Sequence, residues 1–288
     1  MYRSAFALVS LLLAATVPAN DAFAQALEGR LKTIVGNKTI KIAYRADATP
    51  FSFLNNNRQP VGYTVDICKS VVGSLQRQFK VQEIKIEWVP VNAQTRFDTV
   101  ASGKADMECG SSTVTLGRMK VVDFSSFVFV ETTGVMVKAA TGANSFGDLA
   151  GKKVAVIAGT TNAKAVAARS QQLRIPVTLV EVKTREEAVA AVESGNADAF
   201  ASDTLMLVGT PFKDPKSIRL LPDDLSIEPY AIALPRGDWA LRLAVNTALS
   251  QIFRSGEIAI IYSNWFAPLG MQPGAVLRTV FTLGALPE

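Results

Sequence analysis

The run Ser102-Gly-Lys-Ala-Asp106 recurs almost unchanged as Ser194-Gly-Asn-Ala-Asp198. Each copy ends a helical pattern with a glycine that suits a left-handed helix end, and each leads into a short apolar strand. Strand-like runs alternate with helical patterns around both copies, which is typical of βαβ units in a largely parallel sheet. Because the copies occupy equivalent places in two similar successions, the sequence predicts two α/β lobes rather than one long sheet.

The expected elements fall into three groups. The first group has strands at 39–44, 84–89 and 105–109 and helices at 63–79 and 95–101. The second has strands at 153–157, 177–182 and 197–201 and helices at 162–172 and 185–193. A strand at 230–234 and helices at 238–254 and 257–265 could return to complete the first lobe. Two crossings would leave a cleft between the lobes, and ligands of open α/β sheets lie beyond the carboxyl ends of strands.

The N-terminus has the pattern of a secretory signal peptide. Arg3 precedes an apolar run at 5–15, and Ala22-Phe-Ala24 fits an A-x-A cleavage site. This pattern predicts removal of residues 1–24 and a periplasmic location for the mature chain. The alternative, a membrane anchor, is disfavoured because a spanning helix needs about 20 apolar residues.

Composition narrows the function further. The 288 residues carry a formal net charge of +5, which is compatible with an anionic ligand. The basic residues are scattered and the location is extracytoplasmic, so nucleic acid is not an expected partner. Cys68 and Cys109 are the two cysteines. In an exported protein they either form a disulfide or remain two buried thiols, and the sequence leaves both possibilities open.

Charged and hydroxyl side chains follow the expected strands. They are Arg45; Arg96; Ser111, Thr113 and Arg118; Thr160 and Thr161; and Asp203. Arginines offer bidentate forks to carboxylates, a helix N-terminus attracts anions, and one aspartate facing them suits an ammonium group. Together they describe an acidic amino acid. Taken singly, a strand-end arginine is more often a surface ion-pair partner, Gly159-Thr-Thr161 a simple helix start, and Asp203 an N-cap.

Several short motifs give the chain a family resemblance. In the first half they are Pro50-Phe-Ser-Phe53, Val61-Gly-Tyr-Thr-Val-Asp66, Glu108-Cys-Gly-Ser-Ser-Thr113 and Val122-Asp-Phe-Ser125. Further along they are Gly159-Thr-Thr161, Val192-Glu-Ser-Gly195 and Asn264-Trp-Phe266. From about Thr39 to Phe266 the sequence resembles the periplasmic amino-acid-binding proteins of ABC importers, the family 3 solute-binding proteins. The Glu108–Thr113 motif is similar to that of the glutamate/aspartate-binding branch.

The resemblance implies a role for each candidate residue. Arg118 would clamp the α-carboxylate with help from Thr113 and from the Thr160 and Thr161 region. Asp203 and Ser111 would take the α-ammonium, and Arg45 and Arg96 would face the side-chain carboxylate. Three positions depart from the branch: Ala93 and Ala158 stand where serines are usual, and Arg185 stands in place of a histidine and would serve as a further cation.

The resemblance also implies a two-lobed fold that closes around its ligand. Lobe 1 would comprise 25–128 plus 230–288 and lobe 2 would comprise 134–226, with hinge crossings at 128–133 and 226–230. The expected partners are an amino acid and the membrane permease of an ABC importer. We expect a monomer without metal or cofactor.

Two other functions fit the same fold. One is a periplasmic enzyme similar to a dehydratase, for which Glu108 and Asp203 are the candidate carboxylates. The chain has no histidine, no metal-ligand cluster and no P-loop, so we expect a binding protein rather than an enzyme. The other is a detached ligand sensor, which partner capture would separate from a transport protein.

Overall fold

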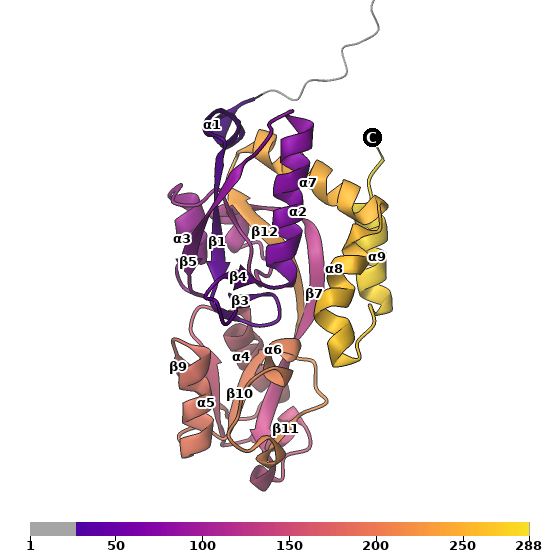
Figure 1. The fold of residues 1–288 in the computed structure, drawn as a ribbon. Helices are drawn as coiled ribbons and strands as arrows, with labels where there is room; N and C mark the ends of the chain where they lie inside the picture. The colour runs from indigo at the N-terminus through magenta and orange to yellow at the C-terminus, as the bar shows by residue number, and fades with distance from the viewer. Residues whose placement is uncertain (1–26, 288) are drawn as a thin grey trace, which may run out of the picture.

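The computed structural model describes residues 27–287 and shows two α/β lobes stacked end to end (Figure 1). The predicted signal peptide, 1–24, lies outside the described residues. In the first lobe β1 (Thr39–Arg45) pairs in parallel with β5 (Lys85–Val91) and β6 (Met107–Glu108). A small separate sheet contains β2 (Asp47–Ala48), β3 (Ser52–Leu54) and β4 (Pro60–Val61).

Helices cover both faces of the first sheet. One hydrophobic cluster joins β1 to residues of α1 (Gly29–Asn37), α2 (Tyr63–Gln78), α7 (Trp239–Arg254) and α8 (Glu257–Phe266). A smaller cluster on the other face contains Val100 of α3 (Arg96–Ala101). The C-terminal α9 (Ala275–Gly284) packs against α7 and the long strand β7 (Val122–Lys138) at the edge of this lobe (Figure 1).

The second lobe is built in the same way around β8 (Lys153–Ile157), β9 (Thr178–Val182), β10 (Ala199–Asp203) and β11 (Ile218–Leu220). Its helices are α4 (Thr161–Leu173), α5 (Arg185–Ser194) and α6 (Thr204–Val208). Val166 of α4 and Val192 of α5 belong to different hydrophobic clusters, so these helices cover opposite faces. Short 3-10 helices lie at Arg118–Lys120, Ala139–Thr141, Phe146–Leu149, Pro215–Ser217 and Ala267–Leu269.

Two strands connect the lobes. The long β7 (Val122–Lys138) pairs with β12 (Ile227–Pro235) as far as Thr132 and with β10 from Thr133 onward. This change of partner supports our placement of the hinge crossings at 128–133 and 226–230, which remains a proposal. Within residues 27–287 the structure contains no helix that is both long and apolar enough to cross a membrane.

Most of the expected elements agree with the structure within about two residues at each end. Gly103 and Gly195, the glycines of the repeated run, have φ angles of 74° and 82°, as a left-handed helix end requires. The strand expected at 105–109 is wrong in length, because only Met107–Glu108 is paired. The antiparallel pairing of β7 with β10 and β12 also makes the sheet less parallel than expected.

Cys68 and Cys109 form a disulfide, which decides between the two possibilities left open by the sequence. The bond ties α2 to the segment that follows β6 and closes a loop with a sequence separation of 41. Both cysteines are fully buried. The segment anchored in this way leads directly to Ser111 and Thr113.

Glu131 is a buried carboxyl group in the long strand β7. Its Oε1 accepts a hydrogen bond from the Leu205 N–H at 3.1 Å, and no cation of the described residues lies within 4 Å. Burial, with a smaller contribution from Asp203, raises the pKa of Glu131 to about 8. The folded protein therefore keeps this proton up to a much higher pH than the unfolded chain does.

We expect Glu131→Gln to stabilise the protein at pH 8 and to have little effect near pH 5. Because the pKa of this carboxyl is raised on folding, its contribution to the free energy of unfolding is complete at low pH. That contribution is lost as the pH rises toward 8, by at most about 1.4 kcal/mol per pH unit, whereas a glutamine has no proton to lose. Glu131 also lines a groove open to solvent, so we expect a gain of only about 2 kcal/mol. Urea unfolding at both pH values measures it. Glu83→Gln, at an exposed carboxylate, is the control, and equal differences at both pH values would contradict the prediction.

Candidate ligand-binding cleft

The carboxyl ends of strands from both lobes meet around one small cavity. It is lined by Arg45, Arg96, Ser111, Thr113, Ile157, Thr160, Thr161, Asn162, Arg185, Ser202, Asp203 and Met206. Eight of the nine candidate residues from the sequence are among them, and Arg118 is not. The cavity has a volume of about 20 Å³, which is near the size of one water molecule. Its walls must therefore move apart to admit an amino acid.

Direct hydrogen bonds hold the lobes together around the cavity. The Gln94 side-chain amide donates to the Ala158 carbonyl at 2.9 Å, and Arg185 Nε donates to the Asp47 carbonyl at 3.3 Å. Ala93 is buried in the same hydrophobic cluster as Phe200 of the second lobe. These contacts describe lobes that are closed against each other.

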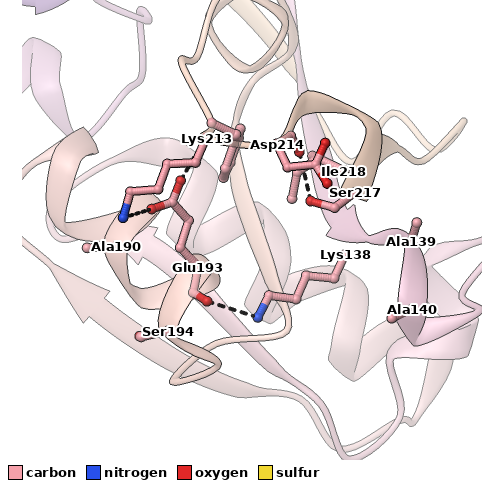
Figure 2. A pocket seen from close by; sticks show the side chains of 11 residues that line it. Lys138, Ala139, Ala140, Ala190, Glu193, Ser194, Lys213, Asp214, Ser217 and Ile218 are labelled. Atoms are coloured by element: carbon pink, nitrogen blue, oxygen red, sulfur yellow. Dashed lines mark hydrogen bonds and ion pairs between the residues drawn. The ribbon is translucent and has the colours of Figure 1, made fainter.

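A larger cavity of about 720 Å³ lies at the far end of the second lobe, near α5 and the 3-10 helix Ala139–Thr141. Its charged side chains already have partners: Lys213 pairs with the Glu193 carboxylate, Lys138 donates to the Glu193 carbonyl (Figure 2), and the Asp214 carboxylate accepts from the Lys216 N–H. It contains none of the candidate residues. The small cavity between the lobes is therefore the better candidate site.

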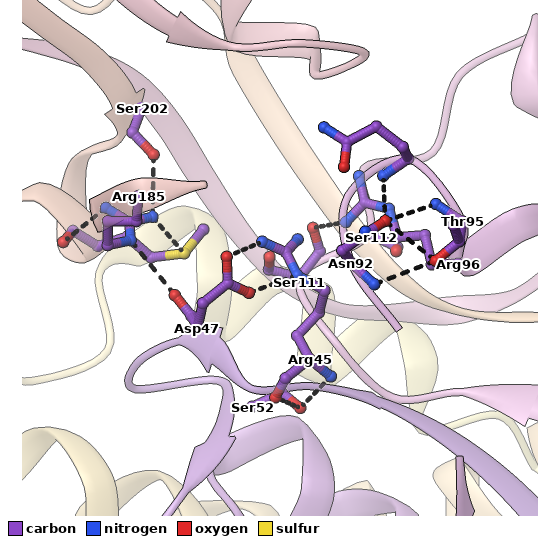
Figure 3. Close-up of polar contacts among 12 residues, drawn as sticks. Arg45, Asp47, Ser52, Asn92, Thr95, Arg96, Ser111, Ser112, Arg185 and Ser202 are labelled. Carbon is purple, nitrogen blue, oxygen red and sulfur yellow. Dashed lines mark hydrogen bonds and ion pairs between the residues drawn. The ribbon is translucent and has the colours of Figure 1, made fainter. Parts of the chain in front are cut away.

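Arg45 reaches the cavity from the end of β1 but is already paired. Its Nε donates to Asp47 Oδ1 at 2.7 Å and its Nη2 donates to Oδ2 at 2.9 Å (Figure 3). Desolvation works against the Arg45 charge, but Asp47 outweighs it, so the Arg45 pKa is raised and the Asp47 pKa is lowered. A ligand carboxylate at Arg45 would share this guanidinium with Asp47.

Arg96, the first residue of α3, is a buried cation with unused donors. Its Nη1 donates to the Ser111 carbonyl at 3.1 Å, while its Nε and the Ser111 hydroxyl have no partner among the described residues (Figure 3). Burial and then the neighbouring Arg118 lower the pKa of Arg96 to about 9, so it is charged at neutral pH. An unpaired buried charge is costly, and an anion placed here would offset that cost.

Arg185 begins α5 and points into the cleft, where only neutral groups hold it. Its Nη1 donates to Thr210 Oγ1 at 3.1 Å and its Nη2 donates to Ser202 Oγ at 3.2 Å. No carboxylate of the described residues lies within 4 Å of it or of Arg96. Burial lowers the pKa of Arg185, as expected for a cation without a partner. Arg96 is therefore the guanidinium of the cavity wall with an unpartnered donor, whereas Arg185 would have to exchange existing hydrogen bonds to neutral groups for an anion.

Asp203 lies at the end of β10 and faces these cations. It occupies the N-cap position of α6, but its side chain makes no capping bond, so the structure does not support a role as a helix cap. Instead, Oδ1 accepts a hydrogen bond from Asn162 Nδ2 at 3.0 Å. Burial raises the pKa of Asp203, and an ammonium group beside it would favour the charged form.

The N-terminus of α4 supplies backbone donors. The Thr160 side chain caps the helix by accepting from the Ala163 N–H at 3.3 Å, and its hydroxyl donates to the Ile157 carbonyl. The N–H groups of Thr161 and Asn162 have no partner among the described residues. These groups and the helix dipole favour an anion at this point.

Arg118 and Thr113 form the adjoining wall. Arg118 Nη1 donates to the Thr113 carbonyl at 2.8 Å, and its guanidinium lies 4.8 Å from the centre of the Phe97 ring. The Thr113 hydroxyl donates to Glu228 Oε2 at 2.6 Å. Any help that Thr113 gives to a carboxylate must therefore come from its backbone N–H.

The sequence did not identify four residues of the cavity wall, nor two acids that hold candidate residues in place: Ile157, Asn162, Ser202 and Met206, and Asp47 and Glu228. Asp47 lies two residues after Arg45, and an acid at that spacing was a readable signal. Asn162 and Glu228 carry no local signal, because their partners Asp203 and Thr113 are distant in sequence. Among residues 27–287 no group of three or more histidine, cysteine or acidic side chains is placed to hold a metal.

Comparison with known proteins places most of the chain in one family. Residues 40–268 match the bacterial extracellular solute-binding proteins, family 3. The chain is 34% identical to an L-glutamate/L-aspartate-binding protein of Pseudomonas aeruginosa, over 90% of this chain and 85% of that protein. It is 27% identical to a glutamate/aspartate import solute-binding protein of Escherichia coli K12, over 92% of this chain and 88% of that protein.

Solved structures agree with this result. An ancestral arginine-binding protein bound to glutamine aligns with a TM-score of 0.70 and 28% identity, over 80% of this chain and 98% of that one. These relatives are binding proteins rather than enzymes. The two-lobed fold, the cleft and the match over most of its length establish that the chain belongs to the bacterial extracellular solute-binding proteins, family 3.

Proposed function

We propose that this protein captures glutamate or aspartate in the periplasm and delivers it, as a monomer, to the permease of an ABC importer. The cavity itself carries the proposal: Arg96, which has an unpartnered donor, and Arg185, which has no carboxylate of the described residues within 4 Å, face Asp203 across a space lined by hydroxyls and a helix N-terminus. This arrangement offers two regions for carboxylates and one for an ammonium group. The named relatives of Pseudomonas aeruginosa and Escherichia coli support the choice of ligand.

In this proposal Arg118 and the first turn of α4 take the α-carboxylate, and Asp203 and Ser111 take the α-ammonium. Arg96 and Arg185 face the side-chain carboxylate, with Arg45 shared between the ligand and Asp47. Residues from both lobes then contact the ligand at once. Because those contacts exist together only when the lobes are closed, the ligand shifts the population toward the closed form.

Isothermal titration of mature protein that has been stripped of bound ligand tests the proposal. The ligands are glutamate, aspartate, glutamine and asparagine. We expect an acid to bind at least about tenfold more tightly than its amide, because each amide leaves a buried guanidinium unpaired. A preference for an amide, or no heat with any of the four, would contradict the proposed ligand.

Asp47 should limit the preference for acids. Its carboxylate already occupies two donors of Arg45, and it repels a second carboxylate while accepting readily from an amide N–H. We expect Asp47→Asn to raise the acid-to-amide affinity ratio by about tenfold, equivalent to about 1.4 kcal/mol. Titration with glutamate and glutamine measures the ratio.

Glu83→Gln removes one negative charge from an exposed loop position and is the matched control. It should leave the ratio unchanged. An unchanged ratio in Asp47→Asn as well would show that Arg45 does not contact the distal group of the ligand.

A further inference from the structure

Glu228 is a buried carboxylate that neither lines the cavity nor pairs with a cation. It lies in the hinge strand β12, where its exposed fraction is 1%. No Lys or Arg nitrogen of the described residues lies within 4 Å of its oxygens. Four hydroxyl groups donate to it instead. A carboxylate without a cation is stable in such a place only when its oxygens accept several hydrogen bonds.

The four donors come from different parts of the molecule. Thr113, after β6 of the first lobe, and Thr161, the first residue of α4 in the second lobe, both donate to Oε2 at 2.6 Å. Thr133 donates to Oε1 at 3.1 Å, and Ser226 donates to Oε1 at 2.5 Å. These last two residues lie in the two chain segments of the hinge. One carboxylate thus joins both lobes and both crossings.

The bond from Ser226, close in sequence, and the bond from Thr161, in the second lobe, respond differently to movement of the lobes. Ser226 is two residues from Glu228 and stays beside it whether the lobes are open or closed. Thr161 belongs to the rigid end of α4, so its hydroxyl leaves Oε2 when the second lobe rotates away. The Thr113 and Thr161 oxygens are only 3.4 Å apart in the closed form, which shows that they meet across the boundary at this carboxylate.

We propose that Glu228 is a positioning residue that latches the lobes closed, by accepting the Thr113 and Thr161 hydroxyls on one oxygen. The latch forms only after closure, so it slows opening and release without changing ligand capture. This proposal rests on the proposed function only in that the protein must bind an amino acid; the identity of that amino acid does not matter. The direction of the affinity change in Glu228→Gln distinguishes a latch from a simple charge effect. Removing a negative charge near the cavity would by electrostatics strengthen binding of an acid, whereas removing a latch weakens binding.

Three variants separate these effects: Glu228→Gln, Thr161→Val and Ser226→Ala. Association and dissociation rates are measured by stopped-flow fluorescence with glutamate, or with glutamine if the wild-type protein prefers the amide. We expect Glu228→Gln to raise the dissociation rate about tenfold and to change the association rate by less than about threefold. In the Thr161→Val background its effect should fall below about threefold, because the lost contact is shared.

Ser226→Ala is the matched control for a general structural effect. It removes a hydroxyl that donates to the same carboxylate and contacts Thr133 Oγ1 at 2.8 Å but does not reach Thr161, so the tenfold effect of Glu228→Gln should persist in that background. The latch would be overturned if Glu228→Gln had the same effect on the dissociation rate in the wild-type, Thr161→Val and Ser226→Ala backgrounds. Tighter ligand binding in Glu228→Gln alone would also overturn it. Thermal melting of each variant confirms that it is folded.

If neither amino acid binds the wild-type protein, the proposed function fails, but the latch is still tested. Pulsed electron paramagnetic resonance then measures the distance between spin labels on exposed positions of the two lobes, Lys104→Cys and Lys164→Cys. Ligand-free Glu228→Gln should show a larger fraction of long distances than the wild-type chain. Identical distance distributions would overturn the proposal.

Discussion

Replacing Arg118 with alanine should weaken binding of the amino acid by about a hundredfold to a few thousandfold, equivalent to about 3–5 kcal/mol. The guanidinium is half-buried, lies over the Phe97 ring and is fixed by a 2.8 Å bond to the Thr113 carbonyl. Glu228 and Glu108 oppose the desolvation that lowers the pKa of Arg118, so it carries its charge. Its loss would leave a ligand α-carboxylate enclosed without its main partner. Isothermal titration with the best ligand measures the effect.

Two further variants show whether the loss comes from the fork geometry of arginine. Arg118→Lys keeps the charge but loses the bidentate fork, and should cost about tenfold. Lys120→Ala removes one positive charge from an exposed position in the same turn and should change affinity less than threefold, or about 0.6 kcal/mol. A change below about threefold in Arg118→Ala would show that the α-carboxylate lies elsewhere.

The sequence predicted the parts of the fold that follow local rules. The repeated Ser-Gly-x-Ala-Asp run located a helix end and a strand start in each lobe because glycine is the residue that accepts the left-handed conformation without strain. The hinge was harder. Residues 128–133 were expected only as a crossing, yet they lie inside β7, a single 17-residue strand that changes partner from β12 to β10. Such a change depends on tertiary packing and leaves no periodicity to read.

The same distinction applies to the site. Arg45, Arg96 and Asp203 were found because strand ends place residues predictably at one edge of a sheet. What these side chains contact was not predictable in the same way. Arg45 was expected to be free for the ligand, but it is paired with Asp47, and the Thr113 hydroxyl is directed to Glu228 rather than into the cavity. Rotamers and distant partners decide these contacts, and neither is encoded in a strand pattern.

Removing the Cys68–Cys109 disulfide should lower the free energy of unfolding by about 4 kcal/mol, because the loop it closes has a sequence separation of 41. In the chain-entropy model the bond restricts the unfolded chain, so the folded lobes need not change. At about 2–4 °C per kcal/mol for a chain of this size, the melting temperature should fall by about 10 °C. Calorimetry of Cys68→Ala/Cys109→Ala against the wild-type protein measures both quantities.

The same experiment separates stability from function. Cys109 is followed within four residues by Ser111 and Thr113, so a disulfide that shaped the folded cleft would change affinity when removed, whereas one that acts on the unfolded chain would not. We expect affinity to stay within about threefold at 25 °C. Wild-type protein refolded in reductant keeps both thiols and controls for the packing lost in the double alanine variant. It should melt near the temperature of that variant, and no shift on reduction would contradict the prediction.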